Sequence, residues 1–266
     1  MLIATDLDGT LLPSGASTVS DYTAQVLRQA DAAGVPVVFV TARPLRWMDA
    51  LWAHVGEHGR AIVSNGAITY DVRARAVLSL DAIVPNVGLD LVAAITAALP
   101  GTTFAIECVD GIRMDPDYVD AVPAPPGSPR GPLAEVWDAP AAKLLVQNAR
   151  ADNATLREVV ASAVGERAVA SWSVPGLVEI SARGVTKASA LARLCASLGV
   201  AASDVIAFGD MPNDIAMLQW AGTAYAMDGA HDSVLAVAHH IAPTVDEDGV
   251  AQVLASLLNR RHDPDG

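Results

Sequence analysis

Cysteines, lysines and long apolar runs are scarce in this chain of 266 residues, and each scarcity narrows what the protein can be. The two cysteines, Cys108 and Cys195, lie in apolar, periodic surroundings, so we expect buried thiols and no disulfide. The longest apolar stretches, such as residues 35–40, are too short to cross a bilayer. The first residues have the pattern of a core strand and not of a secretory leader. These features predict a cytoplasmic protein with no membrane partner.

Positive charge is scarce as well. The chain has 17 Lys and Arg residues against 30 Asp and Glu residues, a formal net charge of −13. Nucleic acids attract clustered basic residues, so this balance argues against a nucleic-acid partner. The apolar fraction of 52% and the charged fraction of 18% indicate a globular chain of one large or two modest domains. If such an acidic protein binds a phosphate ester, it must neutralise that ester locally with a metal ion, a few cations and helix N-termini.

The two ends of the chain alternate short β-rich runs with amphipathic helical patterns. We expect strands over residues 2–8, 35–41, 61–67, 204–210 and 223–228, and helices over residues 21–33, 187–198, 213–220, 233–240 and 249–259. We expect Trp47 and Trp52 to lie in a further helix after the second strand. This alternation predicts an α/β fold, a Rossmann-like parallel sheet with helices on both faces.

The middle of the chain has a different pattern. Four strand candidates, over residues 104–110, 142–148, 168–174 and 177–182, outnumber the two helix candidates, over residues 89–99 and 153–164. A loop rich in proline and glycine, residues 122–132, interrupts them. We therefore expect an inserted α+β domain at residues 81–183 and a discontinuous core formed by residues 1–80 and 184–266.

Carboxylates stand where two predicted core strands end. Asp6 and Asp8 follow the first strand, and Asp210 ends the strand over residues 204–210, with Asp214 in the helical turn that follows. Ligands bind at the carboxyl ends of the strands of open parallel sheets. Crowded carboxylates repel one another unless a cation lies between them, and oxygen ligands suit Mg²⁺. The alternatives are a plain Asp-Gly turn at Asp8 and a favourable helix macrodipole at Asp214.

Two further positions suit an oxyanion. The second strand ends at Thr41, whose hydroxyl could bind an oxyanion together with free backbone amides, although a plain helix cap is an alternative. Lys187 opens a helix and is one of two lysines in a chain with fifteen arginines. That choice suggests a need for a compact ammonium charge, although a solvated residue at a helix start is the alternative.

In chain order, Asp-Leu-Asp-Gly-Thr-Leu-Leu from Asp6, the strand end at Thr41, Gly-Val-Thr-Lys ending at Lys187 and Gly-Asp-x-x-Asn-Asp around Asp210 resemble the haloacid dehalogenase superfamily of phosphohydrolases. The resemblance is to its Cof-type branch, which carries a large α/β cap between the second and third motifs. It covers nearly the whole chain, including residues 64–67 and 246–250. The family often has Thr-Gly-Arg where this chain has Ala42 in the second position, and Lys-Gly where Ala188 follows the lysine. No departure removes a reacting group.

The resemblance implies a role for each motif residue. Asp6 would be the nucleophile and a Mg²⁺ ligand, and Asp8 would be the general acid and base, with its backbone carbonyl on the metal. Asp210 would bind the metal, and Asp214 would orient the waters of that metal. The groups implied to hold the phosphoryl oxygens are the side chains of Thr41, Lys187 and Asn213 and the amides of Leu7 and Ala42. Arg43 is a candidate substrate contact.

These features predict a Mg²⁺-dependent phosphatase that acts on a small phosphorylated metabolite, such as a sugar phosphate, through an aspartyl-phosphate. A phosphomutase of the same superfamily is one alternative, although residues 81–183 hold 7 basic and 13 acidic residues, a balance that disfavours a second phosphate site. A ligand-binding protein without turnover is another. Four residues of this segment (Glu107, Arg113, Asp115 and Trp172) could face a substrate, but core or surface roles suit them as well, so none is assigned. His54 and His58 lack a third zinc ligand.

Overall fold

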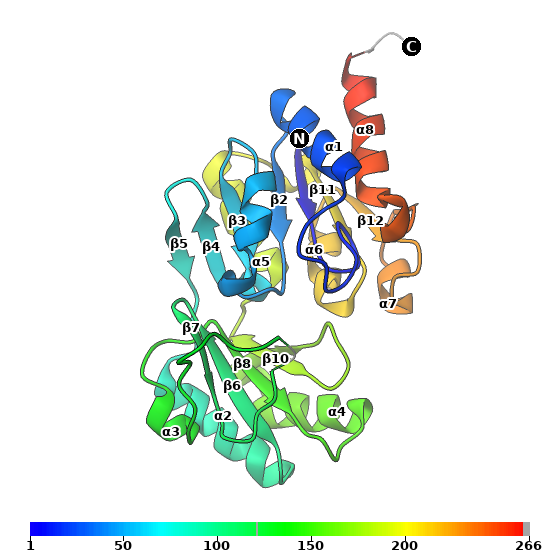
Figure 1. Cartoon of the computed structure of the whole chain (residues 1–266). Coiled ribbons are helices and arrows are strands. Elements are labelled where there is room, and N and C mark those ends of the chain that lie inside the picture. Colours follow the sequence, from blue (N-terminus) through cyan, green and yellow to red (C-terminus); the bar gives the residue numbers. More distant parts are fainter. Residues whose placement is uncertain (121, 263–266) are drawn as a thin grey trace.

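The computed structural model describes residues 1–120 and 122–262, and two β-sheets form within these ranges (Figure 1). The larger sheet has eight strands in the order β13-β12-β11-β1-β2-β3-β4-β5, and the smaller has five in the order β7-β6-β8-β10-β9. All five strands of the smaller sheet lie in sequence between β5 and α5. The smaller sheet is therefore an insertion in the segment that forms the larger one.

The strands and helices of the larger unit are β1 (Leu2–Thr5), α1 (Asp21–Ala32), β2 (Val37–Val40), β3 (Arg60–Val63), β4 (Ile68–Asp71), β5 (Ala76–Leu80), α5 (Lys187–Leu198), β11 (Val205–Gly209), α6 (Ile215–Trp220), β12 (Thr223–Met227), α7 (Asp232–Leu235), β13 (His240–Ala242) and α8 (Gly249–His262). The inserted unit contains α2 (Pro85–Ala98), β6 (Thr103–Cys108), β7 (Gly111–Met114), α3 (Leu133–Val136), β8 (Lys143–Gln147), α4 (Asn153–Val164), β9 (Ala168–Ser171) and β10 (Val178–Ala182).

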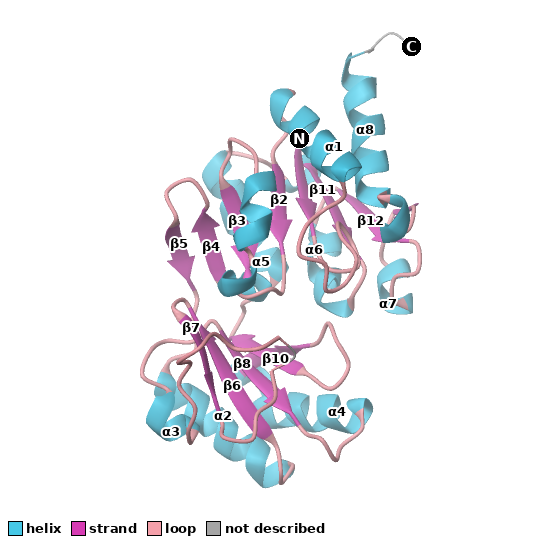
Figure 2. Cartoon of the chain, viewed as in Figure 1, coloured by secondary structure: helices cyan, strands magenta, loops and turns pink. Residues whose placement is uncertain are grey.

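Helices cover both faces of the larger sheet (Figure 2). Successive side chains of a strand point to opposite faces, so Ile3 packs with α1 and α8, whereas Leu2 and Ala4 pack with α5, α6 and α7. The strands from β13 to β3 run parallel, and apolar residues fill both sides of β1 and β2, as a sheet covered on both faces requires. The predicted Rossmann-like α/β architecture is confirmed.

The sheet continues beyond the predicted parallel part. β4 pairs antiparallel with β3, and β5 pairs antiparallel with β4. The local sequence pattern did not predict this hairpin. β5 is only partly buried, so its alternation of apolar and polar side chains is weak.

Two helix predictions were wrong in part. The predicted helix over residues 233–240 is the short α7, and His240 begins β13, which pairs with β12. Pairing with a neighbouring strand outweighs helix propensity here because it completes the edge of the sheet. Trp47 and Trp52 lie in two 3₁₀ helices, Leu45–Trp47 and Asp49–His54, and Trp52 stacks on Tyr70 with the ring centroids 5.3 Å apart.

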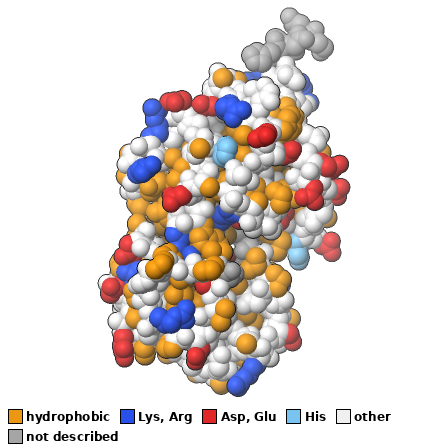
Figure 3. All heavy atoms as spheres, in the orientation of Figure 1, with side chains coloured by type: hydrophobic (Ala, Val, Ile, Leu, Met, Phe, Trp, Pro, Cys, Tyr) orange, Lys and Arg blue, Asp and Glu red, His pale blue; other side chains and the backbone are white. Residues whose placement is uncertain are grey.

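The predicted thiols are buried and unbridged, because Cys108 and Cys195 are both free. Within residues 1–120 and 122–262, no helix combines the length and the apolarity that a membrane span needs. Acidic and basic side chains are interspersed on the face that Figure 3 shows, with apolar groups between them.

Gly88 provides a test of packing in the inserted unit. It lies within α2, where Gly→Ala normally stabilises a helix by about 0.5–1 kcal/mol. A Cβ at this position would lie 1.8 Å from the ring of the buried Trp137. We therefore expect Gly88→Ala to destabilise the protein by about 1–3 kcal/mol, the usual cost of overpacking. Thermal unfolding followed by circular dichroism measures this change. A stabilised variant would contradict the packing of α2 against Trp137.

Candidate active site

Four neighbouring parallel strands end at one edge of the larger sheet. Asp210 follows β11, Asp6 follows β1, Thr41 follows β2, and the turn Ser64–Gly66 follows β3. We call residues 41–43 the β2 loop and residues 64–66 the β3 loop. Because the four strands are adjacent and point the same way, their carboxyl ends bring these segments together, although they are far apart in sequence.

Lys187 is the centre of the cluster. It is the first residue of α5, which Thr186 and Ser189 cap by a reciprocal pair of hydrogen bonds. Its Nζ lies 2.8 Å from Asp6 Oδ1 and 2.6 Å from Asp214 Oδ1, and its side chain is 0% exposed. An isolated buried ammonium is very unfavourable, so the two carboxylates are what make this burial possible.

The carboxylates outnumber the ammonium group. Oxygens of Asp6, Asp210 and Asp214 all lie within 4.8 Å of one another. Burial and the neighbouring Asp214 raise the pKa of Asp6 well above its usual value, although Lys187 acts in the opposite direction. Burial, again with Asp214, raises the pKa of Asp210 to about 6. Burial alone would lower the pKa of Lys187, but the charges of Asp214 and Asp6 outweigh burial and raise it. The cluster thus holds uncompensated negative charge.

Two close contacts fix Asp210. Thr10 Oγ1 donates a hydrogen bond of 2.7 Å to Asp210 Oδ1. Gly9 has a φ of +82°, and a Cβ there would lie 2.4 Å from Asp210 Oδ2. Only glycine permits both this conformation and this approach. The segment after β1 therefore presses directly against the carboxylate that follows β11.

Two of the three carboxylates have an oxygen available for a divalent cation. Asp214 Oδ1 accepts from Lys187, and its Oδ2 accepts from the backbone amides of Asp210 and Met211. Within the described residues, Asp6 and Asp210 each have only Oδ1 engaged, by Lys187 and by Thr10. Each of these two carboxylates thus has its Oδ2 available to a metal ion. Mg²⁺ commonly binds one or two carboxylates together with waters and phosphate oxygens.

Asp8 occupies a different position. Its side chain is 36% exposed, and Arg43 Nε and Nη2 donate to its two oxygens at 2.7 and 2.6 Å. Arg43 Nη2 also donates to the carbonyl of Ala16. The structure therefore places Asp8 on the accessible side of the cluster and fixes its orientation with a bidentate arginine. Arg43 is buried in these contacts, and its role as a substrate contact stays a prediction.

The predicted phosphate-holding groups lie around the same edge. Within the described part of the chain, the amides of Leu7 and Ala42 donate to no backbone or side-chain acceptor, which leaves both open to an oxyanion. Thr41 Oγ1 accepts from the amide of Arg43, so its own proton can still be donated. Asn213 Nδ2 donates to Asn65 Oδ1 at 3.1 Å, and Asn213 Oδ1 is buried without a partner in the described residues.

Two residues at this site carried no role in the sequence analysis, Thr10 and Asn65. Thr10 was visible as part of the first motif, yet nothing in a linear motif shows that its hydroxyl meets a carboxylate 200 residues away. Asn65 follows β3 as Thr41 follows β2, and that position at a strand end was a usable signal. The backbone amide of Asn65 donates a hydrogen bond of 3.0 Å to the carbonyl of Thr41, and this bond joins the β2 and β3 loops.

The candidates weighed in the inserted segment have other contacts. Arg113 pairs with Asp110 and Asp138, and Arg157 stacks on Trp172. Asp115 accepts from the amide of Phe104. Glu107 pairs with Arg46, which follows the β2 loop and also contacts Asp120.

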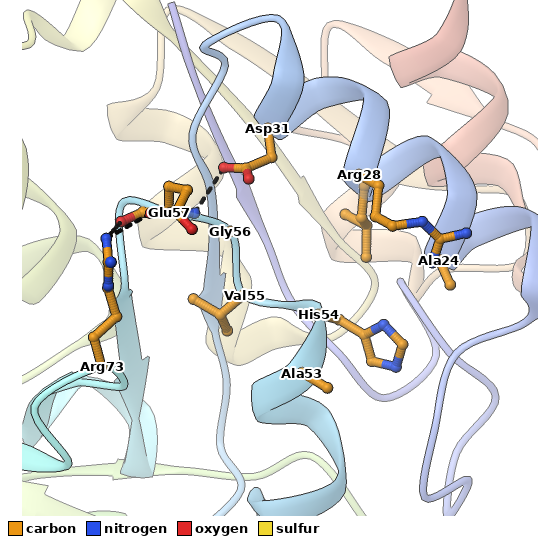
Figure 4. Close-up of a pocket in the computed structure, with 10 residues that line it drawn as sticks. Ala24, Arg28, Asp31, Ala53, His54, Val55, Gly56, Glu57 and Arg73 are labelled. Carbon is orange, nitrogen blue, oxygen red and sulfur yellow. Dashed lines mark hydrogen bonds and ion pairs between the residues drawn. The ribbon is translucent and has the colours of Figure 1, made fainter.

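A cavity of about 260 Å³ lies elsewhere, between α1 and the segment before β3 (Figure 4). It is lined by Ala24, Leu27, Arg28, Asp31, Ala53, His54, Val55, Gly56, Glu57 and Arg73. Glu57 pairs with Arg73, and its amide donates to Asp31. None of the predicted site residues lines this cavity.

Comparison with known proteins agrees with this geometry. Residues 3–254 match the haloacid dehalogenase-like hydrolase family. The chain is 28% identical to a Bacillus subtilis (strain 168) protein, 5-amino-6-(5-phospho-D-ribitylamino)uracil phosphatase YitU, with 97% of each chain covered. It is 27% identical to Escherichia coli (strain K12) pyridoxal phosphate phosphatase YbhA, with 97% of this chain and 98% of that protein covered. The solved structure of SMU.1108c from Streptococcus mutans UA159 superimposes with a TM-score of 0.85 at 24% identity, covering 97% of this chain and 98% of the other.

The carboxylate cluster predicts how the protein responds to Mg²⁺. A ligand that binds only the folded state, at a concentration of about 100 times its dissociation constant, raises the free energy of unfolding by about 2.7 kcal/mol. We expect Mg²⁺ to raise the thermal midpoint of the wild type and to have little effect on Asp210→Asn. In EDTA, Asp210→Asn should be at least as stable as the wild type, because it removes one of the repelling charges while keeping the acceptor for Thr10.

Asp90→Asn is the matched control, since Asp90 is an exposed residue of α2. It should respond to Mg²⁺ as the wild type does. An equal effect of Mg²⁺ on Asp210→Asn would show that this cluster does not bind the ion.

Proposed function

The chain belongs to the haloacid dehalogenase-like hydrolase family, and on that premise we propose that it is a Mg²⁺-dependent phosphatase that hydrolyses a small organic phosphate through an aspartyl-phosphate. One observation carries the proposal. Asp6 follows the central strand β1, and its carboxylate lies beside the buried ammonium of Lys187 and within 4.8 Å of two further carboxylates. A nucleophilic carboxylate, a candidate cation site and the positive charge of Lys187 therefore lie next to one another.

In the first step, a carboxylate oxygen of Asp6 attacks phosphorus, and the bond from phosphorus to the ester oxygen breaks. The groups positioned to receive the phosphoryl oxygens are the ammonium of Lys187, the hydroxyl of Thr41 and the amides of Leu7 and Ala42. These donors are fixed before the reaction, so they stabilise the charge that develops in the transition state. Asp8 gives a proton to the departing alcohol.

In the second step, water attacks the phosphorus of the aspartyl-phosphate. Asp8, now a carboxylate, takes a proton from that water, and the bond between Asp6 and phosphorus breaks to release inorganic phosphate. The exposure of Asp8 supports this role, because its carboxyl group is accessible to water. Asp6 and Asp210 would hold Mg²⁺, with the backbone carbonyl of Asp8 as a further ligand, and Asp214 would orient its waters. When bound, the ion supplies positive charge to the phosphoryl oxygens.

The substrate class follows from the relatives. YitU and YbhA are named for two different small phosphates, which supports a small phosphorylated metabolite as the substrate of this chain. We propose that residues 81–183 form the cap that closes over it, selects it and excludes water. A sugar phosphate remains our preferred substrate. The two buried free thiols support a cytoplasmic location, which is part of the same proposal.

Phosphate release tests the proposed activity. We expect the purified protein to release phosphate from p-nitrophenyl phosphate in Mg²⁺ and to stop when EDTA is added. A panel of hexose phosphates, pentose phosphates, pyridoxal 5′-phosphate and 5-amino-6-(5-phospho-D-ribitylamino)uracil then identifies the preferred ester by kcat/KM. Binding of these esters with no phosphate release would contradict the phosphatase and support a protein that binds its ligand without turnover.

Asp6→Asn tests the nucleophile. The amide keeps the shape of the side chain but cannot form the phosphoryl bond, so we expect kcat to fall by about 10⁴-fold or more. The fold should persist, since Asp214 still pairs with Lys187. Steady-state kinetics and thermal unfolding measure the two effects, with Asp90→Asn as the control. Wild-type turnover by Asp6→Asn would eliminate Asp6 as the nucleophile.

A further inference from the structure

One face of the smaller sheet is apolar, and the other carries three charged residues beside a small apolar cluster; we call it the charged face. Leu144 and Ile180 point to the side that packs with α2 and α4. Glu107 of β6 lies directly opposite Lys143 of β8 in register, and Glu179 of β10 is bonded to Lys143 on the same side. Figure 1 shows the helices of the inserted unit on the side of this sheet away from the larger unit. The charged face therefore looks toward the larger sheet.

Glu107, Lys143 and Glu179 form a row of charges on this face, and each of the three contacts the larger unit. Glu107 pairs with Arg46, Lys143 Nζ donates to the carbonyl of Ala42 at 2.7 Å, and Glu179 Oε2 accepts from Asn65 Nδ2 at 3.1 Å. The three members of the row are 2%, 2% and 3% exposed. Two of the three contacts thus reach the β2 loop, which holds Thr41 and Ala42 of the predicted phosphate-holding groups, and the β3 loop, whose Asn65 bonds Asn213.

Stability does not explain the buried pair of Lys143 and Glu179. Charges removed from water lose so much hydration that an apolar pair of similar volume is often as stable. The chain has only two lysines, Lys143 and Lys187. Both are buried, and both have their ammonium group in or beside the proposed active site. What the pair does provide is a fixed donor for one loop and a fixed acceptor for the other.

The β3 loop needs such support. Ser64 and Asn65 have φ values of 54° and 57°, so two successive residues other than glycine occupy the left-handed region. This conformation is sterically unfavourable and persists only where surrounding contacts enforce it. The side chain of Asn65 has two partners: Glu179 of the smaller sheet accepts from its Nδ2, and Asn213 donates to its Oδ1.

The β3 loop also packs against the residue that precedes Lys187. A Cβ on Gly66 would lie 2.3 Å from the carbonyl of Thr186, the residue that caps the helix of Lys187. A displaced β3 loop would therefore disturb the start of α5 as well as Asn213.

We propose that Lys143 and Glu179 are positioning residues, which hold the β2 and β3 loops in the geometry that the phosphoryl group requires when the cap is seated. This inference deepens the proposed function and rests on it. Lys143 fixes the carbonyl of Ala42, one peptide unit from the amide and hydroxyl that would bind phosphate. Glu179 fixes Asn65, and through it Asn213. The cap thereby contributes to catalysis through the loops that it contacts and not only by enclosing the substrate.

The double variant Lys143→Met/Glu179→Met tests this idea, because it replaces the pair with apolar side chains of similar volume and leaves no lone buried charge. We expect its thermal midpoint to stay close to that of the wild type. Its kcat for p-nitrophenyl phosphate should fall about 10- to 100-fold, as for a small misplacement of catalytic groups, with a much smaller change in KM. Backbone hydrogen exchange should accelerate in residues 41–43 and 64–66.

Arg113→Met is the matched control. Arg113 is also buried in ion pairs of the inserted unit, but it pairs with Asp110 and Asp138 and contacts neither loop. It should leave kcat and the exchange of both loops unchanged. Unchanged exchange and unchanged kcat in the double variant would overturn the inference. If the wild type releases no phosphate, the proposed function fails, and the exchange measurement alone decides whether the pair holds the loops.

Discussion

The buried ammonium of Lys187 is the interaction on which the rest of the site depends. It lies at the start of one helix and is neutralised by Asp6 from the end of β1 and by Asp214 from the turn after β11. None of the three charges could be buried alone, since an unpaired charge in the interior is very unfavourable. Their mutual dependence ties together three segments that are distant in sequence. The cluster is therefore a structural constraint on the sheet as well as a chemical device.

The same cluster is incomplete in charge. Three carboxylates surround one ammonium, and burial together with the repulsion from Asp214 raises the pKa values of Asp6 and Asp210. A bound cation would relieve that repulsion, and a phosphoryl group would then meet positive charge in a protein whose net charge is −13. Local arrangement thus overcomes the unfavourable overall field, because short-range contacts in a buried site are screened far less than distant surface charges.

Close packing sets the geometry around these charges. Because Gly9 has no side chain, the segment after β1 can approach Asp210 closely. Because Gly66 has none, the β3 loop can approach Thr186, the N-terminal capping residue of α5. The contacts of Lys143 and Glu179 extend the same network into the inserted unit. Loops that carry reactive groups are usually the mobile parts of a fold. Here the β2 and β3 loops follow directly on strands of the larger sheet, and they contact the buried Lys143 and Glu179 of the smaller sheet.

The sequence alone determined the parallel core, the inserted α+β segment and the residues of the motifs, because strand and helix periodicity and carboxylates at strand ends are local patterns. It also located α4 at its observed bounds, and it located Lys187 at a helix start. Only the tertiary structure decided the antiparallel extension of the sheet by β4 and β5, the strand at His240 and the pairing of Asp8 with Arg43. The same holds for the contacts of Thr10, Asn65, Lys143 and Glu179. Each of these depends on a partner far away in sequence, and a contact of that kind leaves no trace in the local pattern of residues.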